Sequence, residues 1–272
     1  MAMVINSNPA SLGAQRNLAN TQKSLSANLQ KLSSGSRISQ ASDDAAGLGI
    51  SERLKAQTRS LSQASRNAND GISMIQVAEG AMNEQSGILS RLRELAVQSA
   101  NGTLGTQERG YIQAEADELV GEIDRISSVT EFNGINMIDA AATSIDMQVG
   151  INNGDTITLG FGPTDTATLG VDALDFTSAA GASAAIDSID TAIDALSSQR
   201  STVGAAQNRL QVTLTNLSSA HENLSAANSR IRDVDVAEET ASMTRNQILS
   251  QAGVAVLAQA NQLPSAALSL LG

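Results

Sequence analysis

The sequence of 272 residues contains no cysteine, no tryptophan and a single histidine. The missing cysteines exclude disulfides and thiol catalysis, and together with the lone histidine they exclude a Cys/His zinc site. Aromatic residues make up only 1% of the chain. Because large aromatics usually dominate compact cores, a core of Ala, Leu, Ile and Val indicates long helices packed closely together.

Long apolar runs and basic residues are scarce as well. No stretch of eighteen apolar residues occurs, so no transmembrane helix is predicted, and residues 1–9 lack the pattern of a cleavable secretory signal. No basic residue lies between Arg125 and Arg200, where nine Asp residues occur, and the net charge is −11. This acidic middle argues against binding to nucleic acid or to an anionic membrane.

Both ends of the chain carry apolar residues at a strict spacing of seven, which is typical of helices that pack through a narrow stripe. Termini usually fray, and two helices of about 25 residues bury too little to be stable alone. We therefore expect these terminal seams to associate with each other or with neighbouring copies. They consist of Leu18, Leu25 and Leu32 at the N-terminal end, and of Leu249, Val256, Leu263 and Leu270 at the C-terminal end.

Two longer series with the same spacing, clear over about 51–100 and 183–232, predict two long helices that pack on each other to form the core, and Asp43-Asp44 provides acidic caps for the first. The first is predicted to end at Asn101-Gly102 in a left-handed C-cap, and another helix follows it. The two series contain Leu54, Leu61, Ile75, Met82 and Leu89 in the first helix, and Leu196, Val203, Leu210, Leu217, Leu224 and Ile231 in the second.

Between the long helices the apolar period changes from seven to two. Residues 145–151 and 157–161 alternate apolar and polar side chains around the turn signal Asn152–Asp155. This pattern predicts a β-hairpin, which we expect at the tip of the bundle. The predicted fold is mainly α: a long antiparallel helical bundle or coiled coil formed by the N- and C-terminal halves, with a small β-hairpin tip.

No motif predicts catalytic, cofactor-binding or metal-ligating residues, so an enzyme is not expected. Asp187, Asp190 and Asp194 share one helix face, but no histidine joins them, and a solvated face is the better interpretation. The Asn152–Asp155 segment lacks the acidic ligand that a calcium loop needs at its twelfth position.

Several segments carry a family resemblance. They are LQKLSSGSRISQASDDAAGLGI at 29–50, NDGISMIQVAEG at 69–80, RLRELAVQSAN at 91–101 and QILSQAGVAVLAQANQ at 247–262. These segments resemble bacterial flagellins, and the similarity extends over about 1–140 and 185–272. The nearest alternative is the hook–filament junction protein of the same family. A flagellin with an inserted protease domain is disfavoured because 141–184 has no HExxH motif, and a soluble adaptor is disfavoured by the terminal seams.

The resemblance implies a subunit of the minimal type, with an inner domain D0 and an outer domain D1 only. D0 would comprise the helix and join of 1–42 and the helix of 235–272, and D1 would comprise 43–184 and the helix of 185–234. The implied function is polymerisation into the flagellar filament after export by the flagellar type III system. Implied partners are other copies of the chain, an export chaperone at the C-terminus, the filament cap and the hook–filament junction proteins.

Host recognition is a further implication of the resemblance. Toll-like receptor 5 reads a D1 surface of flagellins, and the matching positions here are Arg91, Leu95 and Glu115. A plant receptor reads the segment that matches 29–50. The alternative for Arg91 is a purely structural role in a surface ion pair with Glu94, which would contribute only a few tenths of a kcal/mol to stability.

Overall fold

The computed structural model describes residues 7–140 and 144–269, and side chains only up to residue 262 at the C-terminal end. The chain forms two compact units. The first unit contains residues 1–56 and 223–272, and the second contains residues 57–222. Two long helices, α2 (Ala45–Ala100) and α5 (Ala179–Arg232), contribute to both units.

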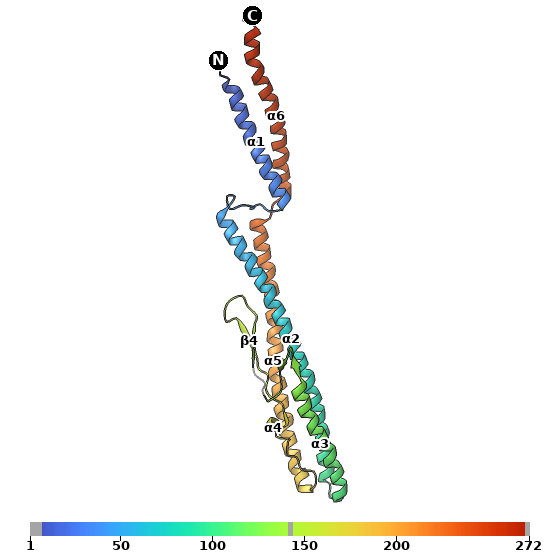
Figure 1. Cartoon of the computed structure of the whole chain (residues 1–272). Helices are drawn as coiled ribbons and strands as arrows, with labels where there is room; N and C mark the ends of the chain where they lie inside the picture. The colour runs from blue at the N-terminus through green and yellow to red at the C-terminus, as the bar shows by residue number, and fades with distance from the viewer. Residues whose placement is uncertain (1–6, 141–143, 270–272) are drawn as a thin grey trace. The chain divides into compact units, whose positions relative to one another are not determined.

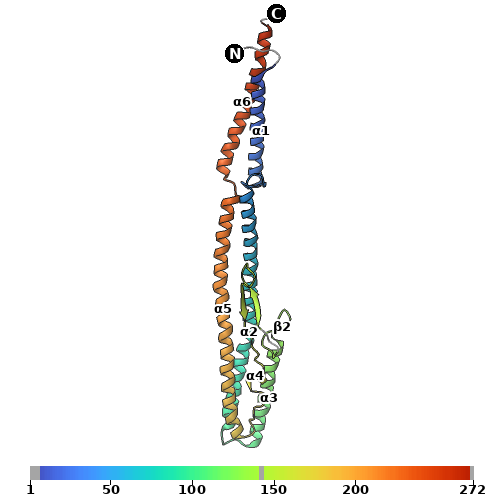
Figure 2. The same ribbon diagram turned by 90° about the vertical axis from the view of Figure 1, so that its left-hand side faces the viewer.

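The first unit is built on two terminal helices, α1 (Pro9–Ser34) and α6 (Val236–Ser269), which lie side by side (Figures 1 and 2). Helix α1 begins with Asn8 as N-cap, whose side chain accepts a hydrogen bond from the Ser11 amide. It ends at Gly35, which has a φ of 68°. This left-handed conformation costs a glycine little, so Gly35 stops the helix.

The second unit is a bundle of α2, α3 (Thr106–Val129) and α5, with the short helix α4 (Thr166–Leu169) beside them (Figure 2). The predicted packing of the two long helices is confirmed, because their seams lie in one apolar core. At Gly71 the helices approach so closely that a Cβ atom would lie 3.2 Å from Cδ1 of Leu210. The buried seam residues are Leu61, Ile75, Met82 and Leu89 on α2, and Leu196, Val203, Leu210 and Leu217 on α5.

The start of α2 agrees with the prediction, and its end differs. The helix begins at Ala45, directly after the predicted acidic caps, and Asp44 Oδ1 accepts a hydrogen bond from the Gly47 amide at 2.8 Å. It ends at Ala100, but Gly102 does not adopt the predicted left-handed conformation. Instead, the guanidinium group of Arg109 donates to the carbonyls of Ser99 and Asn101. A side chain from α3 therefore satisfies carbonyls that a glycine cap would otherwise cover.

The predicted hairpin is present, but its position corrects the expectation of a tip. Strands β3 (Ile145–Gln148) and β4 (Thr156–Leu159) pair antiparallel, with Ile145 opposite Leu159. The hairpin lies along the side of the bundle, where Asn67 of α2 donates to the Gln148 carbonyl at 2.9 Å (Figure 1). Alternating apolar side chains need a partner surface, and the flank of α2 and α5 provides one.

A second, smaller hairpin was not predicted. Strands β1 (Glu131–Phe132) and β2 (Ile135–Asn136) pair through the turn Asn133-Gly134, in which both residues have positive φ. An Asn-Gly pair is the preferred sequence for this type of turn. The strands have only two residues each, which is too short for an alternating pattern to reveal them.

Two of the four aromatic residues lie where the helices alone do not close the core. Phe176 is fully buried and Phe161 is 5% exposed, and both belong to the loops between β4 and α5. Ser99 at the end of α2 donates its hydroxyl to the Phe176 carbonyl, which fixes this loop on the bundle. In the part of the chain that the structure describes, no helix is long and apolar enough to cross a membrane.

We expect Leu89→Ala to lower the free energy of unfolding by about 2–5 kcal/mol, because Leu89 is fully buried in the seam and its truncation leaves a cavity. Val97→Ala on the same helix is the control, since Val97 is 51% exposed, and its effect should stay within about 0.5 kcal/mol. Urea unfolding followed by circular dichroism measures both values. Equal effects of the two substitutions would contradict the assignment of Leu89 to the core.

Candidate self-assembly surface

The N-terminal seam lies against α6. Leu18, Leu25 and Leu32 are half-buried in the single chain, and a Cβ atom on Gly253 of α6 would lie 3.3 Å from Cδ1 of Leu18. The absence of a side chain at Gly253 therefore allows close approach of the two helices. Leu18 of the N-terminal seam thus contacts α6 within the chain.

The C-terminal seam does not face α1. Leu249 is 50% exposed and Val256 is 58% exposed, whereas Gly253 and Ala260 lie on the side of α6 that contacts α1. The side chain of Leu263 and the whole of Leu270 lie outside the described residues. The structure thus separates the two terminal seams: the N-terminal one packs inside the chain, and the described part of the C-terminal one is left on the surface.

Polar contacts fix α1 and α6 together near the chain ends. Asn8 Nδ2 donates to the Ala260 carbonyl at 2.8 Å, and Ser11 Oγ donates to Asn261 Oδ1 at 2.8 Å. Asn28 is also buried between the two helices. Sequence analysis missed these residues because it searched for apolar side chains. Asn28 lies three residues after Leu25 and four before Leu32, so its position in the seven-residue pattern was the available signal.

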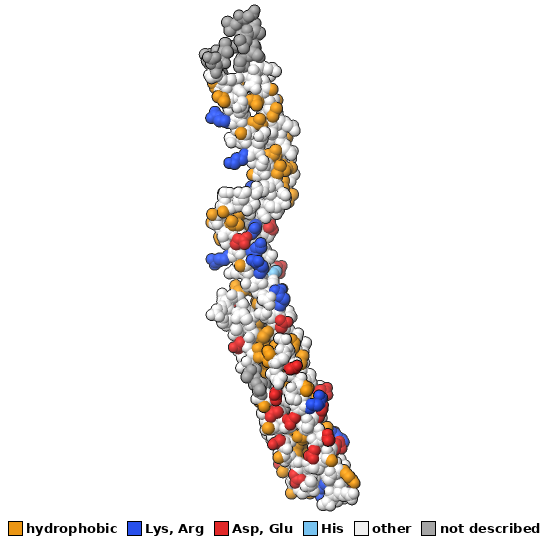
Figure 3. Space-filling view, viewed as in Figure 1, with side chains coloured by type: hydrophobic (Ala, Val, Ile, Leu, Met, Phe, Trp, Pro, Cys, Tyr) orange, Lys and Arg blue, Asp and Glu red, His pale blue; other side chains and the backbone are white. Residues whose placement is uncertain are grey.

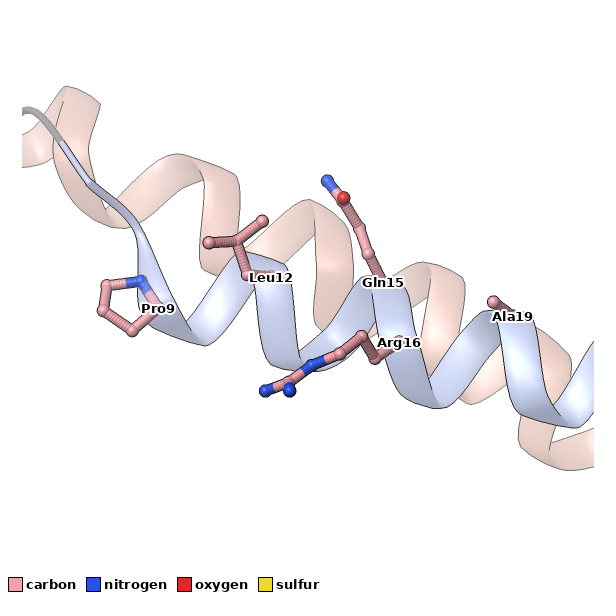
Figure 4. A pocket seen from close by; sticks show the side chains of 5 residues that line it. All are labelled: Pro9, Leu12, Gln15, Arg16 and Ala19. Carbon is pink, nitrogen blue, oxygen red and sulfur yellow. The ribbon is translucent and has the colours of Figure 1, made fainter.

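Additional apolar side chains are exposed on both terminal helices. On α1, a shallow hollow of about 550 Å³ is lined by Pro9, Leu12, Gln15, Arg16 and Ala19. Figure 4 shows these side chains on α1, with the ribbon of α6 behind it. Together with Leu249 and Val256, the large apolar residues that are exposed on the described parts of the terminal helices are Leu12, Leu29, Val236, Ile248 and Val254. Apolar side chains exposed in this number on two helices are available for contact with other subunits.

Charge is distributed unequally over the elements. On the face drawn in Figure 3, Asp and Glu side chains gather over the bundle and hairpins of the second unit, and few lie over α1 and α6. The sequence agrees, since residues 1–42 contain no acidic residue and 240–272 contain Arg245 as the only charged residue. Low charge reduces the repulsion that would oppose close packing of identical terminal helices.

The remaining seam positions lie where the long helices enter the first unit. Leu54 of α2 and Leu224 and Ile231 of α5 are half-buried, in contrast to the buried seam residues of the second unit. The seam therefore continues into the first unit with less coverage.

Two of the three positions matched to the Toll-like receptor surface lie together. The Arg91 guanidinium donates to Glu115 Oε1 at 2.8 Å and to Glu94 Oε2 at 3.0 Å, and the hydrogen bond to Glu115 raises the pKa of Arg91. The side chains of Arg91, Glu94 and Glu115 are largely exposed. Leu95 is only 1% exposed, so it could support such a surface only by holding α2 in place.

A second exposed ion pair joins the two long helices. The Arg93 guanidinium donates to Asp190 Oδ1 at 2.6 Å, and this hydrogen bond holds the pKa of Asp190 below its usual range. The carboxylate face predicted on α5 therefore includes a contact between helices. Among the described residues, no group of His, Asp and Glu side chains is arranged to hold a metal ion.

The geometry defines a helical structural protein with apolar, weakly charged ends, and comparisons with known proteins identify its family. Residues 5–143 match the bacterial flagellin N-terminal helical region, and residues 186–271 match the bacterial flagellin C-terminal helical region. The chain is 48% identical over 271 residues to a flagellin of Halalkalibacterium halodurans, an alignment that covers 99% of this chain and all of that protein. It is 43% identical to a Bacillus subtilis flagellin, with the same coverage.

Solved structures agree with this relationship. The crystal structure of Bacillus cereus flagellin matches 60% of this chain and 94% of that chain at 33% identity, with a TM-score of 0.53. A putative flagellar hook-associated protein from Vibrio parahaemolyticus has the same fold at 16% identity and a TM-score of 0.60, covering 70% of this chain and all of that chain.

The chain belongs to the bacterial flagellin family. It is a flagellin of the minimal type, a structural filament subunit of the extracellular flagellum and not an enzyme. The predictions of family, fold and function from the sequence are confirmed.

We expect the Arg93–Asp190 pair to stabilise the bundle only where Asp190 is ionised. Its pKa in the folded chain lies below the ordinary value of 3.8, so the contribution is fully present above pH 3.8 and is lost as the pH falls below it. Arg93→Ala should therefore lower the urea midpoint at pH 7, and the difference from the unsubstituted chain should shrink below pH 3.8. Arg59→Ala, an exposed arginine on the same helix, is the control. A difference that persists unchanged at pH 2 would refute this account.

Proposed function

We propose that the subunit polymerises through its terminal helices, with the exposed C-terminal seam packing on neighbouring copies. The observation that carries this proposal is the exposure of Leu249 and Val256, which belong to a strict seven-residue series yet are 50% and 58% exposed in the single chain. Burial of such side chains contributes about 1.5–3 kcal/mol each. In this assignment, D0 comprises 1–42 with 235–272, and D1 comprises 43–184 with 185–234.

The route to the filament is part of the same proposal. Subunits would leave the cell unfolded through the flagellar type III export system, with an export chaperone covering the C-terminal segment until then. This is consistent with the exposed apolar side chains of α6, which would aggregate if left uncovered at high concentration. The filament cap and the hook–filament junction proteins would be the neighbours at the two ends of the polymer.

Polymerisation of the purified chain tests this function. Sheared filament seeds are added to the full chain and to a chain that lacks 240–272, and negative-stain electron microscopy follows the products. We expect long filaments from the full chain and none from the truncated chain, because the exposed seam is missing. A full chain that stays monomeric with seeds and with salting-out sulfate would favour the hook–filament junction alternative, which binding to hook ends would then detect.

Single substitutions distinguish the contribution of the exposed seam to polymerisation from that of the rest of α6. Val256→Asp places a charge on the exposed seam and should abolish elongation, whereas Val256→Leu keeps an apolar side chain and should retain it. Circular dichroism of both monomers checks that the bundle is intact. Filaments of normal length from the Val256→Asp chain would show that the exposed seam is not the polymerisation surface.

We also propose that the exposed Arg91–Glu115 pair forms a surface recognised by Toll-like receptor 5. The support is the placement of the two side chains on adjacent helices, 2.8 Å apart and exposed. Arg91→Ala should reduce receptor signalling by the monomer about tenfold or more, in line with the loss of a charged interface contact. Arg125→Ala, which removes an exposed Arg–Glu pair elsewhere on α3, is the matched control. Unchanged signalling by the Arg91→Ala chain would exclude this role.

A further inference from the structure

Met147 of strand β3 lies against Gly71 of α2, where α2 and α5 approach each other closely. A Cβ atom on Gly71 would lie 3.5 Å from both Cγ and Cε of Met147, and 3.2 Å from Cδ1 of Leu210. The thioether sulfur is bonded to both of these methionine carbons, so it also lies beside Gly71. Because Gly71 has no side chain, the flexible methionine fills the space between α2 and the hairpin.

The β3–β4 hairpin is a two-stranded sheet along the side of the bundle (Figure 1). Two helix side chains bind its main chain: Asn67 donates to the Gln148 carbonyl at 2.9 Å, and Gln199 donates to the Gly160 carbonyl at 3.0 Å. A hairpin of two strands is marginally stable in water, so this one depends on its contact with the helices. The hairpin side chains that pack on the core are Ile145, Met147, Val149, Ile157 and Leu159.

Solvent reaches the hairpin on both sides. A hollow of about 530 Å³ lies on the side of α5, where Ile157 and Val212 contribute to its lining. A second hollow of about 350 Å³ lies on the side of α2, where Asn67 and Gln148 contribute to its lining. Both hollows are open, and a molecule as small as hydrogen peroxide can enter them. The contact of the hairpin with the bundle is therefore a narrow apolar strip with water on either side.

Met147 differs in accessibility from the methionines of the helical core. It is partly buried, whereas Met74, Met82 and Met137 are at most 5% exposed. Met243 of α6 is also partly buried, but it belongs to the first unit. Oxidation of sulfur side chains follows their exposure. Met147 is thus the methionine of the described second unit that a soluble oxidant reaches most readily.

From these contacts we infer that Met147 is an oxidation site that controls how tightly the β3–β4 hairpin is held on the bundle. The oxidant is a hydroperoxide. The sulfur lone pair attacks one peroxide oxygen, an S–O bond forms as the O–O bond breaks, and the other oxygen leaves as water when hydrogen peroxide is used. The sulfur loses two electrons and the peroxide gains them. The polar sulfoxide is disfavoured in the apolar contact with Gly71 and Leu210, so the hairpin loosens.

Limited treatment of the full-length monomer with hydrogen peroxide tests which methionine reacts. Peptide mass spectrometry follows the sulfoxide at each methionine with time. We expect Met147 to oxidise at least about tenfold faster than the fully buried Met82 of the same chain. Equal rates at the two positions would overturn the inference, because Met147 would then be as protected as the core. The measurement does not require polymerisation, so its outcome is separate from that of the proposed function.

Hydrogen exchange then measures the effect on the hairpin. After oxidation, we expect amides of 145–149 and 156–159 to exchange at least about tenfold faster than in the untreated chain. Met147→Leu is the matched control, since it keeps an apolar side chain of similar volume that peroxide does not modify. Its hairpin exchange should be the same before and after peroxide treatment, although Met243 is still present.

A Met147→Gln chain places a polar group at the same position without peroxide. It should accelerate exchange in the hairpin to a similar extent, with the helical bundle intact by circular dichroism. Unchanged hairpin exchange after complete oxidation of Met147, or in the Met147→Gln chain, would overturn the inference. Equal acceleration by peroxide in the Met147→Leu chain would overturn it as well, because oxidation elsewhere would then be the cause.

Discussion

The antiparallel packing of α2 against α5 is the interaction on which the other parts of the molecule depend. The aliphatic seam residues from Ile75 to Leu89 on one helix and from Leu196 to Leu210 on the other lie in the core of the second unit. The two hairpins and α3 lie against this pair, and each is too small to fold alone. Because the halves of the chain meet in this seam, their outer segments, α1 and α6, also emerge as neighbours.

The terminal helices follow a different physical rule from the bundle. The bundle buries large aliphatic residues, whereas the α1–α6 contact uses small and polar residues such as Ser11, Asn28 and Gly253. Larger apolar side chains, including Leu249 and Val256, remain on the surface. A contact of this kind fixes the register of α1 against α6 but contributes little to the stability of the pair. It also leaves apolar area available for association with other subunits. This division suits a filament subunit, whose ends need to become fully stable only when neighbours are present.

The sequence predicted the long helices well, because an uninterrupted spacing of seven over about 50 residues has few other interpretations. It also predicted the first hairpin from its alternation and turn signal. It placed that hairpin at a tip, since nothing in a strand pattern tells which surface will cover its apolar face. The β1–β2 hairpin was missed because its strands have only two residues each, too few for an alternating pattern. The Arg109 contacts at the end of α2 were missed because they depend on residues brought together only by folding.

The sequence by itself determined the family, the mainly helical class, the paired long seams and the weak charge of the ends, because each is a property of periodicity or composition. Only the tertiary structure decided which seam is buried. Leu18 and Val256 obey the same spacing, yet Leu18 lies against α6 and Val256 faces outward. The rotation of α6 is set by contacts such as Asn28 with Glu239 and Ser11 with Asn261, between residues more than 200 positions apart. No local pattern contains that information, since such contacts exist only after the two ends have met.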